Sequence, residues 1–544
     1  MEKGQARGIL RSPHPDVEIP DVPLAGFVLS RARELGDKPA LIDGPSGRVL
    51  TYERLAADVE RAAAGLAERG FGKGDVFAMH SPNVPEYAVA FLAVASVGGA
   101  VTTMNPLFTA EELAGQLRDS GARYLLTTPP SSEMARAAAN VVGVREIFVI
   151  GEAEGTTPFA ALLAGGGRAL AVAIDSREDL VALPYSSGTT GRPKGVMLTH
   201  RNLVAGLSQI DGTMPTAEDD TVPAVAPFTH IYGLSVNMLL SLHKGATIVT
   251  TPRFDLEGFL RLVQDHHVTL VYLVPPIVLA LARHPIVESY DLSSLRCIVS
   301  AGAPLGVEVE RGCAERLGVP VVQALGMTEM SPGISVMPSD DPARVKPGSV
   351  GPLVPNTEGR IVDPATGEDV AAGEVGELWA RGPQVMKGYL NRPDATAETI
   401  DADGWLRTGD LCRADEDGYL YVVDRLKELI KYKGLQVAPA ELEAVLLSHP
   451  EVADAAVVGS SGEEAGELPK ALIVAKGEPT AEEIVSFVAE RVAPHKKVRK
   501  VEFVEEIPKS PSGKILRRVL IERERQQEAA ALAGEGGRED LRSV

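Results

Sequence analysis

The amino-acid sequence predicts an α/β protein with two domains of unequal size. Strand and helix patterns alternate as far as Val350, short strands with turn signals follow, and the charge balance changes after Asp424. The 544 residues, 44% of them hydrophobic, are enough for several buried cores. We therefore expect an N-terminal domain in residues 1–424, a smaller α+β C-terminal domain in residues 425–525 and a flexible tail in residues 526–544.

The alternating part of the chain predicts two doubly wound βαβ subdomains. Helical spacing of apolar residues covers residues 58–70 and 85–97. The uncharged run 87–110 indicates a buried helix that enters a loop, and not a membrane span. The predicted strands of this part are residues 75–79, 123–126, 147–150, 246–249, 270–273 and 296–300.

The two remaining regions have patterns of their own. Short strands at residues 374–380 and 417–423 predict a small β barrel. Residues 440–525 predict, in order, a helix, two strands, a helix and a strand, which make a compact α+β domain. Between these regions, Lys427 and Lys431 stand four residues apart in a basic run. They would share one face of a helix, and we expect that face to be functional.

Composition argues against several classes of function. The formal net charge of −20 disfavours a nucleic-acid or anionic-membrane surface, because both would repel the chain. The three cysteines, Cys297, Cys313 and Cys412, show neither paired nor metal-ligand spacing, and the N-terminus lacks the apolar core of a signal peptide. We expect a cytoplasmic protein without a membrane span.

One loop, residues 185–195, gathers hydroxyls, glycines and a lysine in a combination that suits a polyphosphate. Small hydroxyl donors and bare glycine N–H groups can approach phosphate oxygens closely, and Lys194 adds a mobile positive charge. The loop is not the common P-loop, because Pro193 precedes the lysine and Gly195 follows it. It predicts a nucleotide site, with a flexible surface turn as the disfavoured alternative.

Five motifs follow one another along the chain, and together they resemble those of the acyl-adenylate-forming ligases. They are residues 185–195, 326–329, 405–410, 423–434 and 511–514. The run 436–443 is most similar to plant and actinobacterial 4-coumarate:CoA ligases. The resemblance implies that Mg²⁺ and ATP activate a cinnamate- or hydroxycinnamate-type carboxylate as acyl-AMP, with release of pyrophosphate. CoA then forms the thioester.

The resemblance implies a role for each charged group around the nucleotide. Lys514 stabilises the attack of the carboxylate on the α-phosphate, where negative charge builds up, and Lys194 steadies the departing pyrophosphate. Thr328 binds the α-phosphate, Glu329 contacts Mg²⁺, and Asp410 accepts from the ribose hydroxyls. The full set expected around ATP or AMP is Ser186, Ser187, Gly188, Thr189, Thr190, Lys194, Gly302, Gln323, Ala324, Leu325, Thr328, Asp410, Arg425, Lys427, Lys431 and Lys514.

A second arrangement of the C-terminal domain is also implied, for thioester formation. A rotation about a hinge near residues 424–427 replaces Lys514 at the active site with the loop 432–437. Lys431 and Gln436 then act near the acyl-adenylate. The residues expected at CoA are Arg253, Lys433 and Gly434.

The resemblance further implies an acyl pocket of small residues that leaves a flat slot for a planar phenylpropenoate. His230 is expected to be a gate, and Tyr232 to stack on the substrate ring or bond its hydroxyl. The residues expected at the substrate are Tyr232, Gly233, Val236, Ala301, Gly302, Gly326, Pro332 and Val336.

Three positions depart from the family's pattern. Leu325 stands where an aromatic residue usually stacks on adenine, which predicts weaker ATP affinity. Thr229 replaces the common aromatic residue before the gate histidine and is expected to alter acyl selectivity. Val236 replaces a serine, so an apolar ring edge is favoured and cinnamate fits as well as 4-coumarate.

Four alternatives to this interpretation remain open. A fatty-acyl-CoA ligase would differ in pocket length and not in chemistry. A carrier-protein-loading adenylation enzyme is disfavoured because no carrier domain follows, and the motifs do not themselves indicate the oxygen chemistry of a luciferase. A non-catalytic nucleotide-binding protein would be expected to lack Lys194, Glu329 or Lys514, and all three are present.

Overall fold

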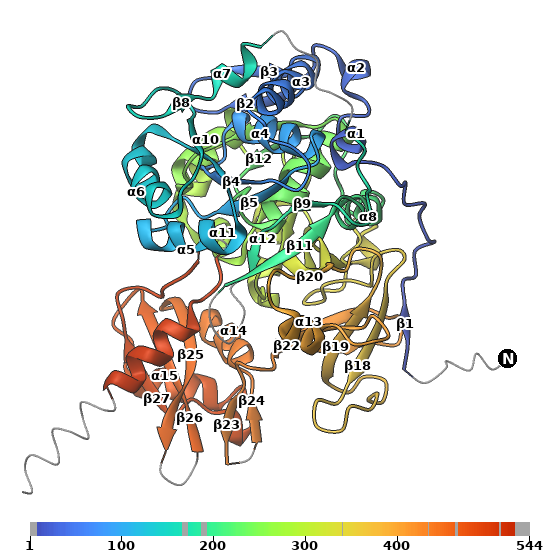
Figure 1. The fold of residues 1–544 in the computed structure, drawn as a ribbon. Helices are drawn as coiled ribbons and strands as arrows, with labels where there is room; N and C mark the ends of the chain where they lie inside the picture. The colour runs from blue at the N-terminus through green and yellow to red at the C-terminus, as the bar shows by residue number, and fades with distance from the viewer. Residues whose placement is uncertain are drawn as a thin grey trace, which may run out of the picture.

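A computed structural model of the chain describes residues 8–165, 172–186, 193–339, 341–433, 435–462, 466–510 and 513–527. Figure 1 shows a large body that carries most of the chain, and a smaller body at its lower left that contains α14 and α15. Both bodies combine helices with sheets, so the structure has the α/β fold class that the sequence predicts. Within the described ranges, no helix is both long and apolar enough to cross a bilayer.

The first subdomain is built on a nine-stranded sheet in the order β10-β11-β9-β5-β4-β6-β7-β8, with β20 paired to β11. Its strands are β4 (Val76–His80), β5 (Ala100–Met104), β6 (Tyr124–Thr127), β7 (Glu146–Val149), β8 (Thr157–Pro158), β9 (Leu180–Ala182), β10 (Tyr185–Ser186), β11 (Lys194–Thr199) and β20 (Gly388–Tyr389). Its helices are α3 (Tyr52–Glu68), α4 (Pro85–Ser96), α5 (Ala110–Ser120), α6 (Ser132–Val142), α7 (Ala160–Leu163) and α8 (His200–Asp211). The parallel pairing of β4 with β5 and β6 is that of a βαβ unit.

The run 87–110, expected to be a helix entering a loop, contains a strand as well. The helix ends at Ser96, and β5 follows between β4 and β9 in the middle of the sheet. Every residue of β5 is buried. A strand covered on both faces lacks the alternation of polar and apolar residues that marks a half-exposed strand, so its period is invisible in the sequence.

The second subdomain contains two four-stranded sheets, ordered β12-β13-β2-β3 and β14-β15-β16-β17. The strands are β2 (Pro39–Asp43), β3 (Val49–Thr51), β12 (Thr221–Ala224), β13 (Thr247–Thr250), β14 (Leu270–Leu273), β15 (Cys297–Ser300), β16 (Val321–Gly326) and β17 (Gly333–Val336). The helices are α1 (Leu24–Val28), α2 (Ala32–Leu35), the π-helix η2 (Gly233–Leu240), α9 (Ser241–Lys244), α10 (Leu256–Asp265), α11 (Pro275–Arg283) and α12 (Val307–Leu317). Strands β14, β15 and β16 run parallel, so their carboxyl ends meet at one edge.

The region predicted as a small β barrel is a five-stranded antiparallel sheet, in the order β1-β18-β19-β21-β22. Its elements are β1 (Leu10–Arg11), β18 (Glu358–Val362), β19 (Gly376–Arg381), β21 (Leu406–Ala414), β22 (Leu420–Arg425) and the helix α13 (Pro393–Thr399). The pairing of β21 with β22 sets Asp410 opposite Arg425. The 3-10 helices of the chain are η1 (Pro129–Ser131), η3 (Pro285–Ser289), η4 (Thr328–Met330), η5 (Pro342–Arg344) and η6 (Pro494–Lys496).

The C-terminal body has its own sheet, in the order β24-β23-β26-β25, with β27 on β26. Its elements are β23 (Ile430–Tyr432), β24 (Leu435–Val437), α14 (Pro439–Ser448), β25 (Val452–Gly462), β26 (Gly466–Ala475), α15 (Ala481–Ala489) and β27 (Lys500–Phe503). After Ala440 the structure therefore contains the predicted helix, two strands, helix and strand. A separate apolar core, which includes Val437, Leu446 and Ile473, lies between the sheet and its helices.

The prediction that Lys427 and Lys431 share one face of a helix is wrong. Lys427 lies in a turn, and Lys431 lies in β23, where its neighbour Ile430 is buried while Lys431 itself is exposed. That alternation has the period of a strand, and β23 pairs with β24 across a tight connection. Lysines spaced for a helix face thus occur here in a turn and a hairpin.

Candidate active site

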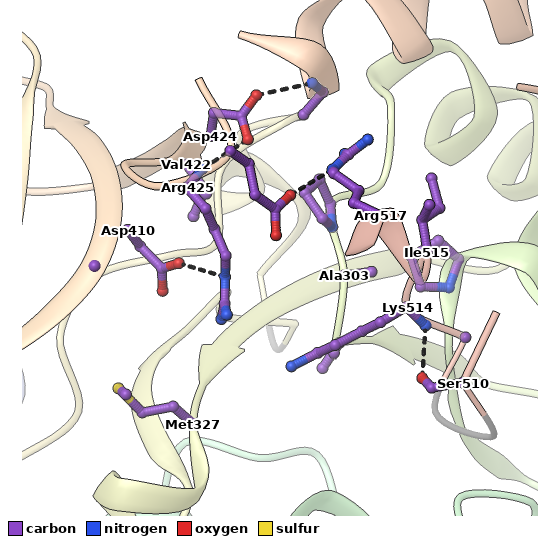
Figure 2. A pocket seen from close by; sticks show the side chains of 18 of the residues that line it. Ala303, Met327, Asp410, Val422, Asp424, Arg425, Ser510, Lys514, Ile515 and Arg517 are labelled. Atoms are coloured by element: carbon purple, nitrogen blue, oxygen red, sulfur yellow. Dashed lines mark hydrogen bonds and ion pairs between the residues drawn. The ribbon is translucent and has the colours of Figure 1, made fainter. Parts of the chain in front are cut away.

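A cavity of about 1890 Å³ lies where the C-terminal body meets the large one. Its walls include the carboxyl ends of β15 and β16, the pair β21–β22, the connection to the C-terminal body and the segment 513–519. Most of the residues predicted from the sequence line it. Figure 2 shows Asp410 and Arg425 on one side of this space and Lys514 reaching into it from the other.

Lys514 is held at the end of a tight turn. The Ser510 N–H donates to the Lys514 carbonyl at 2.8 Å, and the Lys514 N–H donates back to the Ser510 hydroxyl at 3.2 Å. Gly513 has φ +76°, and a Cβ at that position would lie 3.0 Å from Val274 of the large body. Glycine is required at this position both because φ is positive and because a side chain would come too close to Val274. This conformation lets the following residue, Lys514, reach the cavity.

Burial changes the electrostatics of Lys514. Removal from water and, secondarily, the charge of Arg425 lower the pKa of the ammonium, which is about 8. Asp410, Glu329 and Glu428 act in the opposite direction. A cation in this position is poorly solvated, so it interacts strongly with any negative charge that enters the cavity.

His230 is neutral in this setting. Burial, and secondarily the nearby Lys514 charge, lowers the pKa of its imidazole to about 3. The Tyr232 N–H donates to His230 Nδ1 at 3.3 Å, which makes Nδ1 the acceptor and leaves the ring proton on Nε2. His230 can therefore present one hydrogen-bond donor without a charge.

Asp410, which is buried, forms an ion pair with the partly exposed Arg425 at the opposite wall. Arg425 Nε lies 3.0 Å from Asp410 Oδ1, and the carboxylate is 4% exposed. Burial raises the pKa of the Asp410 carboxyl, while the positive charges of Arg425 and Lys514 oppose that rise. Figure 2 shows this bond as a dashed line, with Met327 beyond it. The pair presents a fixed carboxylate and guanidinium to the same space.

Thr328 and Glu329 lie in η4, one residue after the end of β16, and both are buried. The Tyr389 hydroxyl donates to Glu329 Oε1 at 2.8 Å. Gln323, on β16, donates from Nε2 to the carboxylate of Glu310 at 2.6 Å and also lines the cavity. In the described ranges, no group of three or more acidic, histidine or cysteine side chains is arranged to hold a metal ion.

The residues expected at the acyl group surround one part of the cavity. Those that line it are Tyr232, Val236, Ala301, Gly302, Gly326, Pro332 and Val336, together with Thr229 and His230. Gly233 lies beside them at the start of η2. The Tyr232 hydroxyl donates to the Val299 carbonyl at 3.2 Å, so the ring is fixed against β15. A Cβ at Gly326 would lie 2.5 Å from the Pro332 carbonyl oxygen, so only glycine fits there.

The structure leaves the residues expected for the second step away from this cavity. Lys431 and Gln436 are directly opposite one another on the β23–β24 hairpin, and both are exposed. Lys433 and Arg253 are exposed as well. In the described part of the chain, none of these four side chains lines the cavity, whereas Lys427 does.

Several expected residues lie outside the described residues. They are Ser187, Gly188, Thr189 and Thr190 of the hydroxyl-rich loop, Gly434, and Pro511 and Ser512 before the turn. Ser186 and Lys194, on either side of that loop, are described and line the cavity. They lie opposite each other in the pairing of β10 with β11, which brings the two ends of the loop together.

Two side chains that sequence reasoning did not name belong to the surroundings of the site. Arg517 makes bonds to both carboxylate oxygens of Glu443 and one to Glu428, which fixes the chain just after Lys514. Tyr389 contacts Glu329 from β20. Both contacts join segments far apart in sequence, and no spacing rule could have found them.

The C-terminal body and the large body share this cavity, and comparison with known proteins gives the class of the protein. The AMP-binding enzyme family matches residues 29–390, and the AMP-binding enzyme C-terminal domain matches residues 441–514. The chain belongs to the AMP-binding enzyme family.

Individual relatives narrow this class. The chain is 46% identical over 523 residues to 4-coumarate–CoA ligase 5 of Oryza sativa subsp. japonica, covering 94% of this chain and 96% of that one. It is 43% identical to 4-coumarate–CoA ligase 1 of Arabidopsis thaliana, with 94% of each chain covered. Among solved structures, the anthranilate CoA ligase AuaEII in complex with anthranoyl-AMP matches with a TM-score of 0.87 at 27% identity, covering 94% of this chain and 99% of that one.

Proposed function

We propose that this protein is an AMP-forming acid–thiol ligase that joins an aromatic carboxylic acid to CoA at the expense of ATP. The convergence of Lys514, Glu329, Asp410 and Arg425 on one cavity carries the proposal. Attack of one anion on another is opposed by charge repulsion, and this cavity offers cations and donors where that charge increases. The free, buried cysteines favour a reducing, cytoplasmic location.

In the first step, an oxygen of the substrate carboxylate attacks the α-phosphorus of ATP. The bond from that phosphorus to the bridging oxygen of the β-phosphate breaks, and pyrophosphate leaves with the bonding electrons. Lys514 stabilises the charge on the carboxylate and the α-phosphate, and Thr328 donates to the latter. Lys194 stabilises the departing pyrophosphate. Asp410 accepts from the ribose hydroxyls, with Arg425 holding its carboxylate in place.

Mg²⁺ fits this site as a cation that is bound mainly through the nucleotide. Glu329 offers a buried carboxylate at the cavity, and within the described residues no three acidic, histidine or cysteine side chains are grouped as an all-protein cage. Magnesium commonly takes one or two carboxylates together with phosphate oxygens and water. When bound, it would neutralise charge on the phosphates, and Glu329 would hold it.

In the second step, the C-terminal domain turns about residues 424–427 and brings Lys431 and Gln436 to the acyl-adenylate. The CoA thiolate attacks the acyl carbon, the carbon–oxygen bond to AMP breaks, and AMP leaves with its phosphate charge. The residues proposed to bind CoA are Arg253, Lys433 and Gly434. Arg253 and Lys433 are not among the described residues that line the cavity, which agrees with a domain arrangement suited to the first step.

We propose a cinnamate- or hydroxycinnamate-type acid as the substrate. The similarity to 4-coumarate–CoA ligases and to a CoA ligase named for anthranilate favours a planar aromatic acid over a fatty acid. Val236 is buried at the pocket wall and presents only carbon atoms, so a ring without a 4-hydroxyl is accommodated as well as 4-coumarate.

A pyrophosphate-release assay with and without CoA tests this function across benzoates, cinnamates and fatty acids of medium and long chain. We expect release with cinnamate and 4-coumarate, and thioester only when CoA is present. Activity restricted to long fatty acids would refute the aromatic substrate. Absence of release with every acid would favour a nucleotide-binding protein without this activity.

A further inference from the structure

Tyr389 lies where three segments of the large body meet. Its strand β20 pairs with β11, which follows the hydroxyl-rich loop, so that Val196 lies opposite Tyr389. The Leu390 N–H donates to the Gly195 carbonyl at 2.8 Å, and the Met386 N–H donates to the Glu329 carbonyl at 2.9 Å. The backbone around Tyr389 is thereby bonded both to the end of the phosphate loop and to η4.

The side chain of Tyr389 is buried and contacts one charged group from each of these segments. Its hydroxyl donates to Glu329 Oε1 at 2.8 Å. The ammonium of Lys194 lies over its ring, 4.1 Å from the centroid. A cation over an aromatic face is attracted by the ring's π electrons, so one side chain holds an anion at its edge and a cation on its face.

The hydroxyl of Tyr389 is a donor throughout the physiological range. A phenol ordinarily ionises only at about pH 10, and the carboxylate of Glu329, 2.8 Å from the hydroxyl oxygen, can only accept. The bond therefore keeps one direction, from phenol to carboxylate. A neutral donor to a carboxylate fixes its orientation without neutralising its charge.

The main chain of Tyr389 does not depend on this side chain for its position. The Tyr389 N–H donates to the Thr396 hydroxyl at 2.9 Å, and the neighbouring Lys387 N–H donates to the Met197 carbonyl at 2.9 Å. Loss of the hydroxyl alone removes no backbone bond. Tyr389→Phe therefore separates the contact with Glu329 from the fold of the strand.

We propose that Tyr389 is a positioning residue that orients Glu329 for the cation and Lys194 for the outer phosphates of ATP. This inference rests on the proposed function, because it concerns how the same nucleotide is held. The hydroxyl acts on the cation side through Glu329, and the ring acts on the phosphate side through Lys194. The two effects are separable, because phenylalanine keeps the ring without the hydroxyl, whereas leucine has neither the ring nor the hydroxyl.

The test is equilibrium binding of ATP by calorimetry, in excess Mg²⁺ and again in EDTA, without acyl substrate. We expect Tyr389→Phe to weaken Mg·ATP binding by roughly tenfold, as for loss of a hydrogen bond to a charged group, and to leave binding in EDTA unchanged. Tyr389→Leu is expected to weaken ATP binding by a further factor of about three, with Mg²⁺ and in EDTA alike. The reason is that Lys194 loses its contact with the aromatic ring.

Tyr421→Phe is a matched control. Tyr421 donates to a carboxylate oxygen of Asp415 at 3.3 Å and has Arg413 over its ring at 4.0 Å, but it belongs to β22 and is not among the described residues that line the cavity. We expect this variant to bind both forms of ATP like the parent protein. It shows what loss of such a contact does away from the nucleotide.

Three outcomes would overturn the inference: unchanged Mg·ATP binding in Tyr389→Phe, equal weakening with and without Mg²⁺, or the same loss in Tyr421→Phe. If Tyr389→Leu fails to fold, the double variant of Tyr389→Phe with Glu329→Gln decides. We expect it to bind Mg·ATP no more weakly than Glu329→Gln alone, whereas additive losses would contradict the inference. Because no carboxylic acid is used, the result is independent of failure to release pyrophosphate.

Discussion

Two faces of the C-terminal body carry the lysines that we propose to be catalytic, and the two faces differ in their exposure to solvent. Lys514, at the end of its turn, is enclosed in the cavity with Arg425, Asp410 and Glu329. Lys431, on the β23–β24 hairpin, is exposed together with Gln436. The C-terminal body thus carries both sets of groups that we propose to act in the two steps, and in this structure only the set with Lys514 lines the cavity.

The comparison shows which electrostatic effects oppose the enclosed position of the Lys514 ammonium and which favour it. Enclosing an ammonium removes its hydration, which is why the pKa of Lys514 falls to about 8. The nearby carboxylates of Asp410, Glu329 and Glu428 offset part of that cost. The arrangement is therefore expected to be stabilised further when the negative charge of ATP fills the cavity, and to be released when pyrophosphate leaves.

Removal of the enclosed lysine is expected to have the largest effect. Lys514→Ala should slow adenylation by roughly a hundredfold or more, equivalent to about 3 kcal/mol of transition-state stabilisation, and still convert supplied acyl-AMP to thioester. The two half-reactions are measured separately, as pyrophosphate release and as thioester formation. Lys73→Ala, which removes a surface ion pair with Asp179, is the control. Equal losses in both half-reactions would contradict the proposal that different faces of the C-terminal domain act in the two steps.

The exposed face should give the opposite pattern, with a smaller effect. Lys431→Ala is expected to slow thioester formation from supplied acyl-AMP by roughly tenfold or more, and to leave pyrophosphate release within a factor of about two. The reason is that its side chain is exposed in this structure, which we propose to be the arrangement for adenylation. Slowed adenylation in this variant would show that the hairpin already acts in the first step.

The pH dependence of adenylation should follow the charge of Lys514. Its pKa is lowered to about 8, so the required ammonium is present below that pH and is lost above it. We expect kcat/KM for pyrophosphate release, measured without CoA, to be level below pH 8 and to fall roughly tenfold per pH unit above it. Lys514→Arg keeps its charge and should remove this fall. A profile that is level through pH 10 in the parent protein would disprove the assignment.

The smallest expected effect concerns a contact between the two bodies. Arg283, at the end of α11, donates to the Leu447 carbonyl in the last turn of α14. Such a bond is worth about 1 kcal/mol, so Arg283→Ala should reduce the adenylation rate by roughly fivefold and leave thioester formation unchanged or faster. Arg311→Ala, which removes an ion pair with Glu308 within α12, is the control. Unchanged adenylation in Arg283→Ala would show that this bond does not hold the bodies together.

Local pattern determined much of the fold. The strand predicted at residues 270–273 is β14, and the helix, strand, strand, helix, strand order after Ala440 occurs as predicted. Strand β14 is buried at every residue, and its signal is a short apolar run that ends before Pro275, not an alternation of polar and apolar residues. Strand β5 was missed because its buried Ala, Val and Thr residues continue the uncharged run of the helix before it. The basic helix at Lys427 and Lys431 was wrong because charge spacing does not decide between a helix and a hairpin.

By itself, the sequence determined the chemistry this protein carries, because a lysine after a Ser-Gly turn or a carboxylate after Gly-Met-Thr has a local signature. Only the tertiary structure decided which of these groups meet. It enclosed Lys514 with Asp410 and Arg425, left Lys431 exposed, and brought Tyr389 to Glu329 across 60 residues. Burial and charge proximity depend on how distant segments pack, and that packing sets the pKa values and the reach of each side chain.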